Sequence, residues 1–135
     1  YLFGSVLKNR VYHNFLPHKI WYTFNIFPSH SVSFFEKKRT HLINGKYNIK
    51  FKYSADRDYI YRLIRNKNLK GFSTSKGDLF GKFSMYGLSS KVSFLEKNLE
   101  EIKIRIKNKQ NIFIILSMFL IFLVYYLFRK IINKA

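Results

Sequence analysis

The longest apolar run of the chain, from Ile112 to Phe128, restricts its possible folds more than any other feature. The run holds 17 residues without a charge, Gly or Pro. This length is at the short end of what crosses a hydrocarbon core of about 30 Å, and residues 131 and 132 extend it if the two intervening basic side chains bend toward the headgroups. A buried core helix rarely needs so long a stretch without polar residues. The run therefore predicts a single transmembrane helix over residues 111–132.

This prediction assigns roles to two sets of residues. The predicted membrane span includes Ile112, Phe113, Leu116, Phe119, Leu120, Leu123, Tyr125, Tyr126 and Phe128. The basic residues on its two sides, predicted to contact anionic phospholipid or a partner, are Lys103, Arg105, Lys107, Lys109, Arg129, Lys130 and Lys134. The basic counts on the two sides are too close to decide the topology by the positive-inside rule alone. We expect the N-terminal domain in the mitochondrial matrix, because only a short tail would then cross the inner membrane.

The composition indicates an anionic partner. The chain has 25 Lys and Arg against 7 Asp and Glu, a formal net charge of +18. Lipid headgroups, nucleic acid or an acidic protein surface could offset this charge. The abundance of Phe, Tyr, Ile, Lys and Asn, whose codons are AT-rich, favours an AT-biased genome such as an organellar one. The absence of Cys excludes disulfides, thiolate catalysis and Cys-based metal sites.

Residues 1–35 form an aromatic-rich basic arm without an acidic residue. The arm shows little periodicity, and Pro17 and Pro28 interrupt it. Such a segment can lie in a groove of a partner, where aromatic and Arg side chains carry much of the binding energy, or pack on its own domain. The Trp, Tyr, Thr and Phe residues between Ile20 and Ile26 favour a strand there.

The next segment, residues 36–89, is predicted to be a small α+β domain. Asn44-Gly45 supplies the two positive φ angles of a type I′ turn, and residues 46–53 alternate between aromatic or aliphatic and polar side chains, so we expect a β-hairpin. Ser54 is the expected N-cap of a helix that ends near residues 66–68. Its two first-turn carboxylates, Asp56 and Asp58, are two residues apart and point to different sides, so they do not form a catalytic pair.

Closely spaced glycines mark the end of this domain. We expect a second hairpin with a turn at residues 76–78 and strands near 70–75 and 79–86. The stretch from Gly71 to Lys76 lacks the Gly before the Lys and the Ser or Thr after it that a phosphate-binding loop requires.

Residues 90–110 are predicted to form an amphipathic juxtamembrane helix. Ser93 and Glu96 have the spacing of a capping box. A heptad-like seam follows at steps of three and four, suited to a coiled coil or to packing beneath the small domain: Val92, Leu95, Leu99, Ile102 and Ile106. Because no Gly or Pro follows residue 87, we expect the helix to continue into the span as a rod of about 65 Å, before a tail at 133–135.

Catalytic and metal-binding motifs are missing from the sequence. No two of His13, His18, His30 and His41 have the i,i+3 or i,i+4 spacing of helical metal ligation. Hydrolase, zinc-protease and dinucleotide fingerprints are also absent. We therefore expect no enzymatic activity, no metal and no cofactor.

The sequence thus predicts an α+β fold with two β-hairpins and helices, followed by a C-terminal single-pass anchor. The expected function is that of a non-catalytic accessory subunit of a multi-subunit membrane complex, such as a mitochondrial respiratory-chain or ATP synthase assembly. The alternative is a membrane-tethered protein that binds RNA or the ribosome, which the high charge favours. The spread of the basic residues over nearly every element argues against this alternative.

Overall fold

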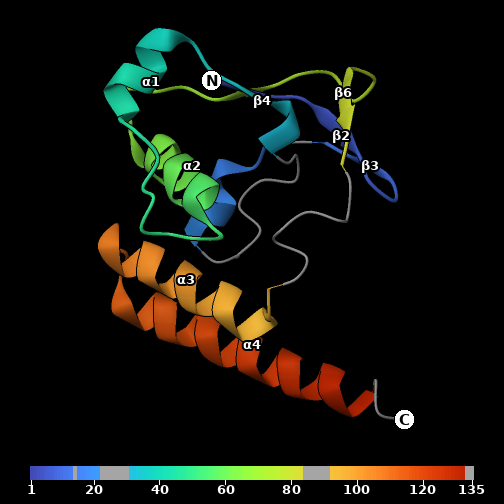
Figure 1. Ribbon diagram of the computed structural model, residues 1–135, viewed down its shortest axis with the longest axis vertical. Helices are drawn as coiled ribbons and strands as arrows, with labels where there is room; N and C mark the ends of the chain where they lie inside the picture. The colour runs from blue at the N-terminus through green and yellow to red at the C-terminus, as the bar shows by residue number, and fades with distance from the viewer. Residues whose placement is uncertain (14, 22–30, 84–91, 133–135) are drawn as a thin grey trace.

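The computed structural model describes residues 1–13, 15–21, 31–83 and 92–132. The fold is α+β, with two small three-stranded sheets and several helices (Figure 1). The strands are β1 (Leu2–Phe3), β2 (Ser5–Leu7), β3 (Val11–Tyr12), β4 (Phe34–Phe35), β5 (Phe72–Ser73) and β6 (Leu79–Lys82). The helices are α1 (Lys38–Asn44), α2 (Ala55–Arg65), α3 (Phe94–Lys107) and α4 (Ile112–Ile132), with short 3-10 helices η1 (Pro17–Trp21) and η2 (Ser31–Ser33).

The first strands of the chain lie at the centre of both sheets. β1 pairs antiparallel with β4 and parallel with β5, and β2 pairs antiparallel with β3 and parallel with β6. Gly4 alone separates β1 from β2, and a Cβ there would lie 2.3 Å from the Phe80 ring, so the close approach requires glycine. The strands β1, β2 and β3 of the N-terminal arm therefore pack on the chain's own domain.

An aromatic core holds the first sheet against α2. Phe3 is 1% exposed and packs between Phe15 and Phe34, with ring centroids 4.9 and 5.2 Å away. The buried side chains of α2 that complete this core include Tyr59, Ile60 and Leu63. The amphipathic pattern of α2 is thus confirmed, with Ser54 at its N-cap position and Asn66 at its C-cap.

The predicted Asn44-Gly45 hairpin is wrong. Residues 40–43 belong to α1, and the structure assigns no strand to residues 46–53. Gly45 does adopt a positive φ of 77°, but this residue ends α1 and donates its N–H to the His41 carbonyl. Positive φ at glycine serves helix ends as well as hairpin turns, so the dipeptide alone could not distinguish the two.

The second predicted hairpin is only partly correct. β5 and β6 lie within the expected residues, and a turn joins Ser75 to Asp78 through a 3.1 Å backbone hydrogen bond. The two strands join different sheets, however, and each takes a parallel partner from the N-terminal arm. The expected strand at residues 20–26 falls mainly outside the described residues.

The capping box at the start of α3 is confirmed. The Ser93 hydroxyl accepts from the Glu96 N–H at 3.2 Å, and the Glu96 carboxylate accepts from the Ser93 N–H at 3.1 Å. The Ser93 hydroxyl also donates to the Glu96 carboxylate at 2.7 Å, and this bond, together with the one from the Ser93 N–H, lowers the pKa of Glu96. The acid thus remains charged at the positive end of the helix dipole.

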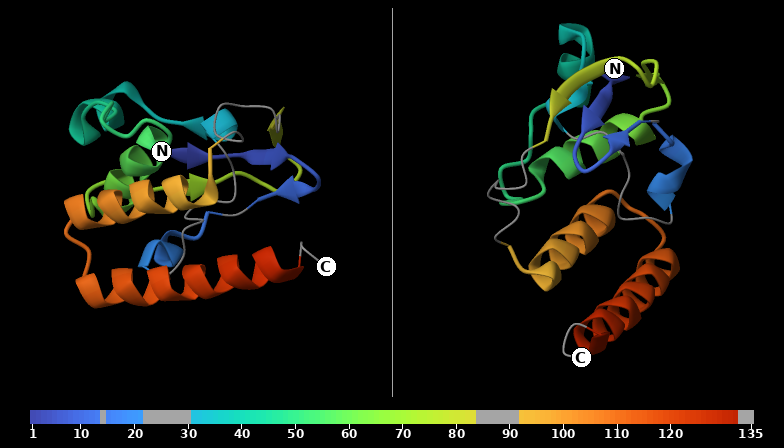
Figure 2. Two further views of the ribbon diagram at one scale, coloured as in Figure 1. Left: turned by 60° about the horizontal axis from the view of Figure 1, so that its bottom comes forward. Right: turned by 90° about the vertical axis from the view of Figure 1, so that its right-hand side faces the viewer.

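The expected continuous rod is wrong, because α3 and α4 form an antiparallel helical hairpin (Figure 2). Lys109 has a φ of 55° and follows the C-cap residue Asn108. The Lys109 N–H donates to the Ile106 carbonyl, and the Gln110 N–H donates to the Arg105 carbonyl. This pair of hydrogen bonds is a Schellman motif, which ends α3 without Gly or Pro.

The single-pass transmembrane anchor is also wrong. Within the part of the chain that the structure describes, no helix has both the length and the apolar character needed to cross a membrane. The uncharged run of 17 residues is roughly 26 Å long at about 1.5 Å per residue, less than a core of about 30 Å. One face of α4 packs on α3 instead. The membrane-anchored localisation, with the N-terminal domain in the matrix, loses its basis.

The turn between α3 and α4 allows a test by substitution. Replacing Lys109 with Gly is expected to raise the free energy of unfolding by about 1 kcal/mol, because glycine avoids the steric cost of positive φ. Chemical denaturation measures the change. As a control, Lys103→Gly at an exposed position inside α3 should lower the free energy of unfolding by about 1 kcal/mol. A loss of stability in the Lys109 variant would contradict the left-handed conformation.

Candidate functional site

The outer face of α4 is a wide apolar surface. Among the side chains of α4 that the structure describes, only Ile115 and Met118 are buried, at 2% and 4% exposure. The predicted span residues Phe119, Leu123 and Tyr126 are half-buried. The other predicted span residues are exposed, in several cases by more than half: Ile112, Phe113, Leu116, Leu120, Tyr125 and Phe128. Ile121, Val124 and Leu127 extend the same exposed surface.

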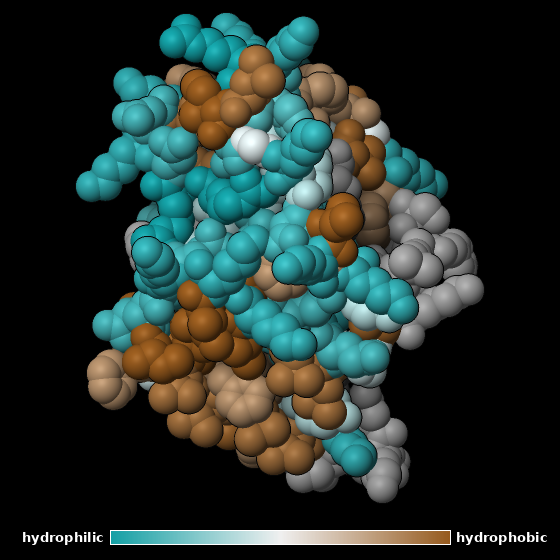
Figure 3. Space-filling view, turned by 60° about the vertical axis from the view of Figure 1, so that its left-hand side comes forward, coloured by the Kyte–Doolittle hydropathy of each residue, from teal (hydrophilic) through white to brown (hydrophobic). Residues whose placement is uncertain are grey.

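The apolar seam of α3 adds to this surface. Leu95, Leu99 and Ile106 are between 44% and 54% exposed, and Ile102 is half-buried. Figure 3 shows hydrophobic side chains gathered at the end of the molecule formed by the α3–α4 hairpin, whereas hydrophilic side chains cover much of the remaining face. We call the exposed apolar residues of α3 and α4 the hairpin face. A contiguous apolar surface on this scale is typical of an interaction site.

A hollow lies where the start of α3 meets the second half of α4. Its volume is about 500 Å³, and its walls include Phe94, Asn98 and Ile121. The Phe94 ring stacks on Phe122 and Tyr126, with centroids 5.6 and 5.2 Å away. These stacked rings fix the geometry of the hollow, which can receive a side chain from a partner.

The predicted basic contacts divide into different environments. Lys103, Lys109 and Lys130 are exposed, with Lys109 in the α3–α4 turn and Lys130 near the end of α4. Lys107 is also exposed, but its ammonium faces the domain, 5.3 Å from the centre of the Phe51 ring. Arg105 is fully buried, so a partner cannot reach it. The side chain of Arg129 and all of Lys134 lie outside the described residues.

The face of α3 that packs on the domain carries buried polar side chains beside the apolar Ile104, a feature that the seam concealed in the sequence. Glu101 and Arg105 are both 0% exposed and form an ion pair of 3.0 Å. The Arg105 guanidinium also donates to the Gln110 side-chain carbonyl at 2.7 Å, and the Tyr61 hydroxyl donates to the same oxygen at 2.8 Å. This buried network fixes the position of the hairpin on α2.

A second buried acid strengthens the same junction. Asp58 of α2 is 0% exposed and accepts from Arg62 at 3.1 Å and from the Asn108 side chain at 3.0 Å. The ammonium of Lys107 lies 3.9 Å away. Asp58 thus links α2 to the C-terminal end of α3, which is a structural role rather than a catalytic one.

Glu36, His41 and Tyr59 form a polar cluster between α1 and α2. The Tyr59 hydroxyl lies 2.7 and 2.8 Å from the Glu36 carboxylate oxygens, and His41 Nδ1 lies 2.9 Å from the hydroxyl. Burial raises the pKa of Tyr59, and its hydrogen bond to Glu36 raises it further. The Tyr59 ring stacks on Tyr47 at 4.2 Å. The hydroxyl therefore stays protonated and holds the two helices together.

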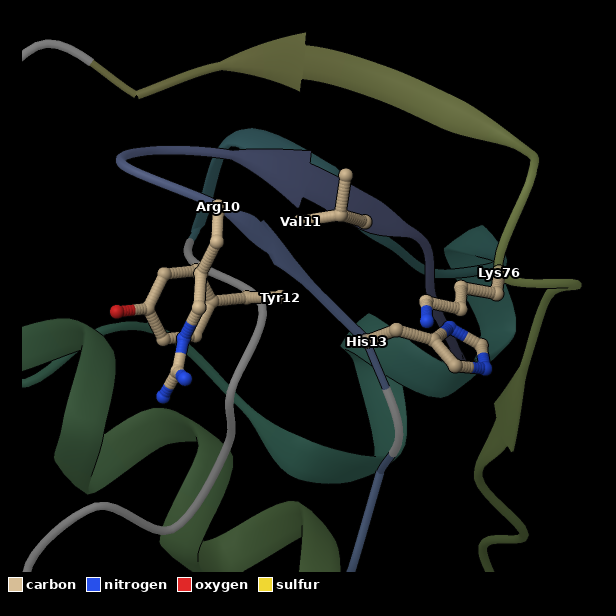
Figure 4. Close-up of a pocket in the computed structure, with 5 residues that line it drawn as sticks. All are labelled: Arg10, Val11, Tyr12, His13 and Lys76. Atoms are coloured by element: carbon tan, nitrogen blue, oxygen red, sulfur yellow. The ribbon is translucent and has the colours of Figure 1, made fainter.

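A basic cavity lies at the edge of the second sheet, near the turn before β6 (Figure 4). Its volume is about 570 Å³, and it is lined by Arg10, Val11, Tyr12, His13 and Lys76. The Arg10 guanidinium lies 5.3 Å from the centre of the Tyr12 ring. The sequence could not reveal this site, because 63 positions separate His13 from Lys76 and only the parallel pairing of β2 with β6 joins them.

Within the described residues, no group of three or more acidic or histidine side chains is arranged to hold a metal ion. His13 and His41, each in a different part of the fold, serve in hydrogen bonds with Ser5 and with the Glu36–Tyr59 pair. No protein-family model, curated protein or solved structure matches the chain.

Proposed function

We propose that the chain is a non-catalytic accessory subunit of a multi-subunit membrane complex, held in place by another subunit that covers the hairpin face. The observation that carries the proposal is the exposure of Phe113, Leu120 and Ile121, at 75%, 59% and 68%. Apolar side chains exposed to this extent favour burial against a partner, at about 25 cal/mol for each Å² removed from water.

The charges around the hairpin face indicate the chemistry of the partner. Lys109 precedes α4 and Lys130 lies near its end, with no charge between residues 112 and 128. A second copy packed antiparallel would bring these like charges together, and a parallel copy would align each with itself. A helix of a different subunit, apolar at its centre and acidic at its rim, fits both features.

A pair of matched substitutions tests this proposal in cells that produce the protein. Leu120→Lys should release the tagged full chain from its complex, because an unpaired charge in an apolar interface costs about 3 kcal/mol, or ~100-fold in affinity. Leu42→Lys is the control, since Leu42 of α1 is 70% exposed and lies outside the hairpin face. Purification in mild detergent followed by native electrophoresis gives the readout.

The expected pattern is a large complex for the wild type and for the Leu42 variant, unchanged by nuclease, and a small species for the Leu120 variant. Circular dichroism should show the same helical content in all three. Assembly of the Leu120 variant like the wild type would contradict the proposal. A wild type that migrates alone, or only as a dimer, would contradict it as well.

A further inference from the structure

The cations of the basic cavity are not neutralised within the described part of the chain. Neither Arg10 nor Lys76 forms an ion pair there. The nearby acid Asp78 uses its carboxylate to accept from the Ser75 N–H at 2.9 Å, which fixes the turn beside Lys76. Two cations at opposite sides of one cavity, Arg10 beside Tyr12 and Lys76 beside His13, attract a ligand that carries more than one negative charge.

His13 is held in a defined orientation at the wall of this cavity. The Ser5 hydroxyl donates its single proton to the Ser75 carbonyl at 3.2 Å, and its oxygen lies 3.1 Å from His13 Nδ1. The Ser5 oxygen therefore accepts a hydrogen bond from the Nδ1–H, which assigns the tautomer of the neutral ring and leaves Nε2 for another partner. In Figure 4 the His13 ring lies near the Lys76 side chain.

An aromatic ring distinguishes this cavity from a simple phosphate site. Tyr12 is half-buried, and its ring lies under the Arg10 guanidinium. Aromatic rings beside basic side chains are the combination with which proteins bind single-stranded nucleic acid, because bases stack on the ring while the cations contact phosphates. We propose that this cavity binds one nucleotide unit of single-stranded nucleic acid, with one of its flanking phosphates at His13 and Lys76, the other at Arg10, and the base at Tyr12.

The position of the cavity favours nucleic acid over a lipid surface. The second sheet lies at the opposite end of the molecule from the α3–α4 hairpin (Figure 1). A lipid bilayer at the cavity would leave the apolar hairpin face pointing away from it. A flexible strand can reach the cavity while a partner subunit covers the hairpin face, so the two sites are independent.

The test measures binding of a fluorescent 12-nucleotide oligo(U) to the full chain by anisotropy, over a series of salt concentrations. Arg10→Ala/Lys76→Ala should weaken binding about 20-fold at 0.1 M salt and reduce the log–log salt slope by about 1.4, because two phosphate contacts are lost. Tyr12→Leu should weaken binding about tenfold with the salt slope unchanged, since it removes only stacking.

Arg39→Ala/Lys67→Ala provides a control with the same net charge. Both of these residues are exposed on other elements, so this variant should bind within about twofold of the wild type. Equal losses in the cavity and control variants would overturn the proposal in favour of a general effect of charge. Unchanged binding of oligo(U) by the cavity variant would overturn it too. So would binding to anionic phospholipid vesicles that depends on Arg10 and Lys76 when binding to oligo(U) does not.

Discussion

Replacing Arg105 with Met is expected to lower the free energy of unfolding by about 3–5 kcal/mol, as measured by chemical denaturation. The substitution keeps the length of the side chain but removes the partner of Glu101, which is 0% exposed. Arg57 remains 3.4 Å from that carboxylate, but it is farther away than Arg105 at 3.0 Å and its side chain is 32% exposed. The buried Glu101 carboxylate would then lack most of the positive charge that offsets its desolvation, which accounts for the size of the expected loss of stability.

A double-mutant cycle separates the ion pair from the loss of packing. Glu101→Leu combined with Arg105→Met should cost much less than the sum of the two single changes, because the double variant leaves neither charge buried alone. Lys103→Met, on the exposed side of α3, should change stability by no more than about 0.5 kcal/mol. A loss below about 1 kcal/mol in the Arg105 variant would show that this network does not hold the hairpin.

Replacing Phe3 with Ala is expected to cost about 3–5 kcal/mol, again measured by chemical denaturation. Phe3 is 1% exposed, lies on the central strand of the first sheet and contacts the rings of Phe15 and Phe34. Its removal leaves a cavity that the surrounding rings cannot fill without moving away from α2.

Phe72→Ala offers a matched control for this prediction. Phe72 lies on the neighbouring strand β5 but is 61% exposed, so its loss should cost less than about 1 kcal/mol. Equal effects of the two substitutions would mean that the N-terminal strands pack too loosely to form part of the core. That outcome would favour the alternative in which residues 1–35 lie in a groove of a partner.

Signals confined to a few neighbouring residues predicted the structure well. The capping box of Ser93 and Glu96 marked the start of α3, and the apolar stripe of α2 identified the side that is buried. Gly45 adopts the expected positive φ, although it ends a helix instead of turning a hairpin. These features depend on interactions within about four residues, which the order of residues along the chain specifies directly.

Features that depend on distant residues could not be predicted in this way. β1 and β2 contain two and three residues, too few to show an alternating pattern, and their parallel partners lie some 70 positions away. The basic cavity exists only because of that pairing. On α3, the seam of Leu95, Leu99 and Ile106 suited either a coiled coil or packing beneath the domain, yet Glu101, Ile104 and Arg105 occupy the face that packs on the domain. Hydrophobic periodicity cannot anticipate a helix that packs through an ion pair.

The parallel pairing of β1 with β5 and of β2 with β6 also sets an order of events during synthesis. Leu2 pairs with Phe72 and Leu7 pairs with Lys82, so neither sheet can be completed until these later strands have been made. At about 5–20 residues per second, the first strands wait roughly 4–15 s for their partners. Throughout this interval Phe3 and Val6, both buried in the finished protein, remain exposed to other chains. The nascent polypeptide thus has a period of vulnerability to aggregation, for which a chaperone that covers its first residues would be the natural remedy.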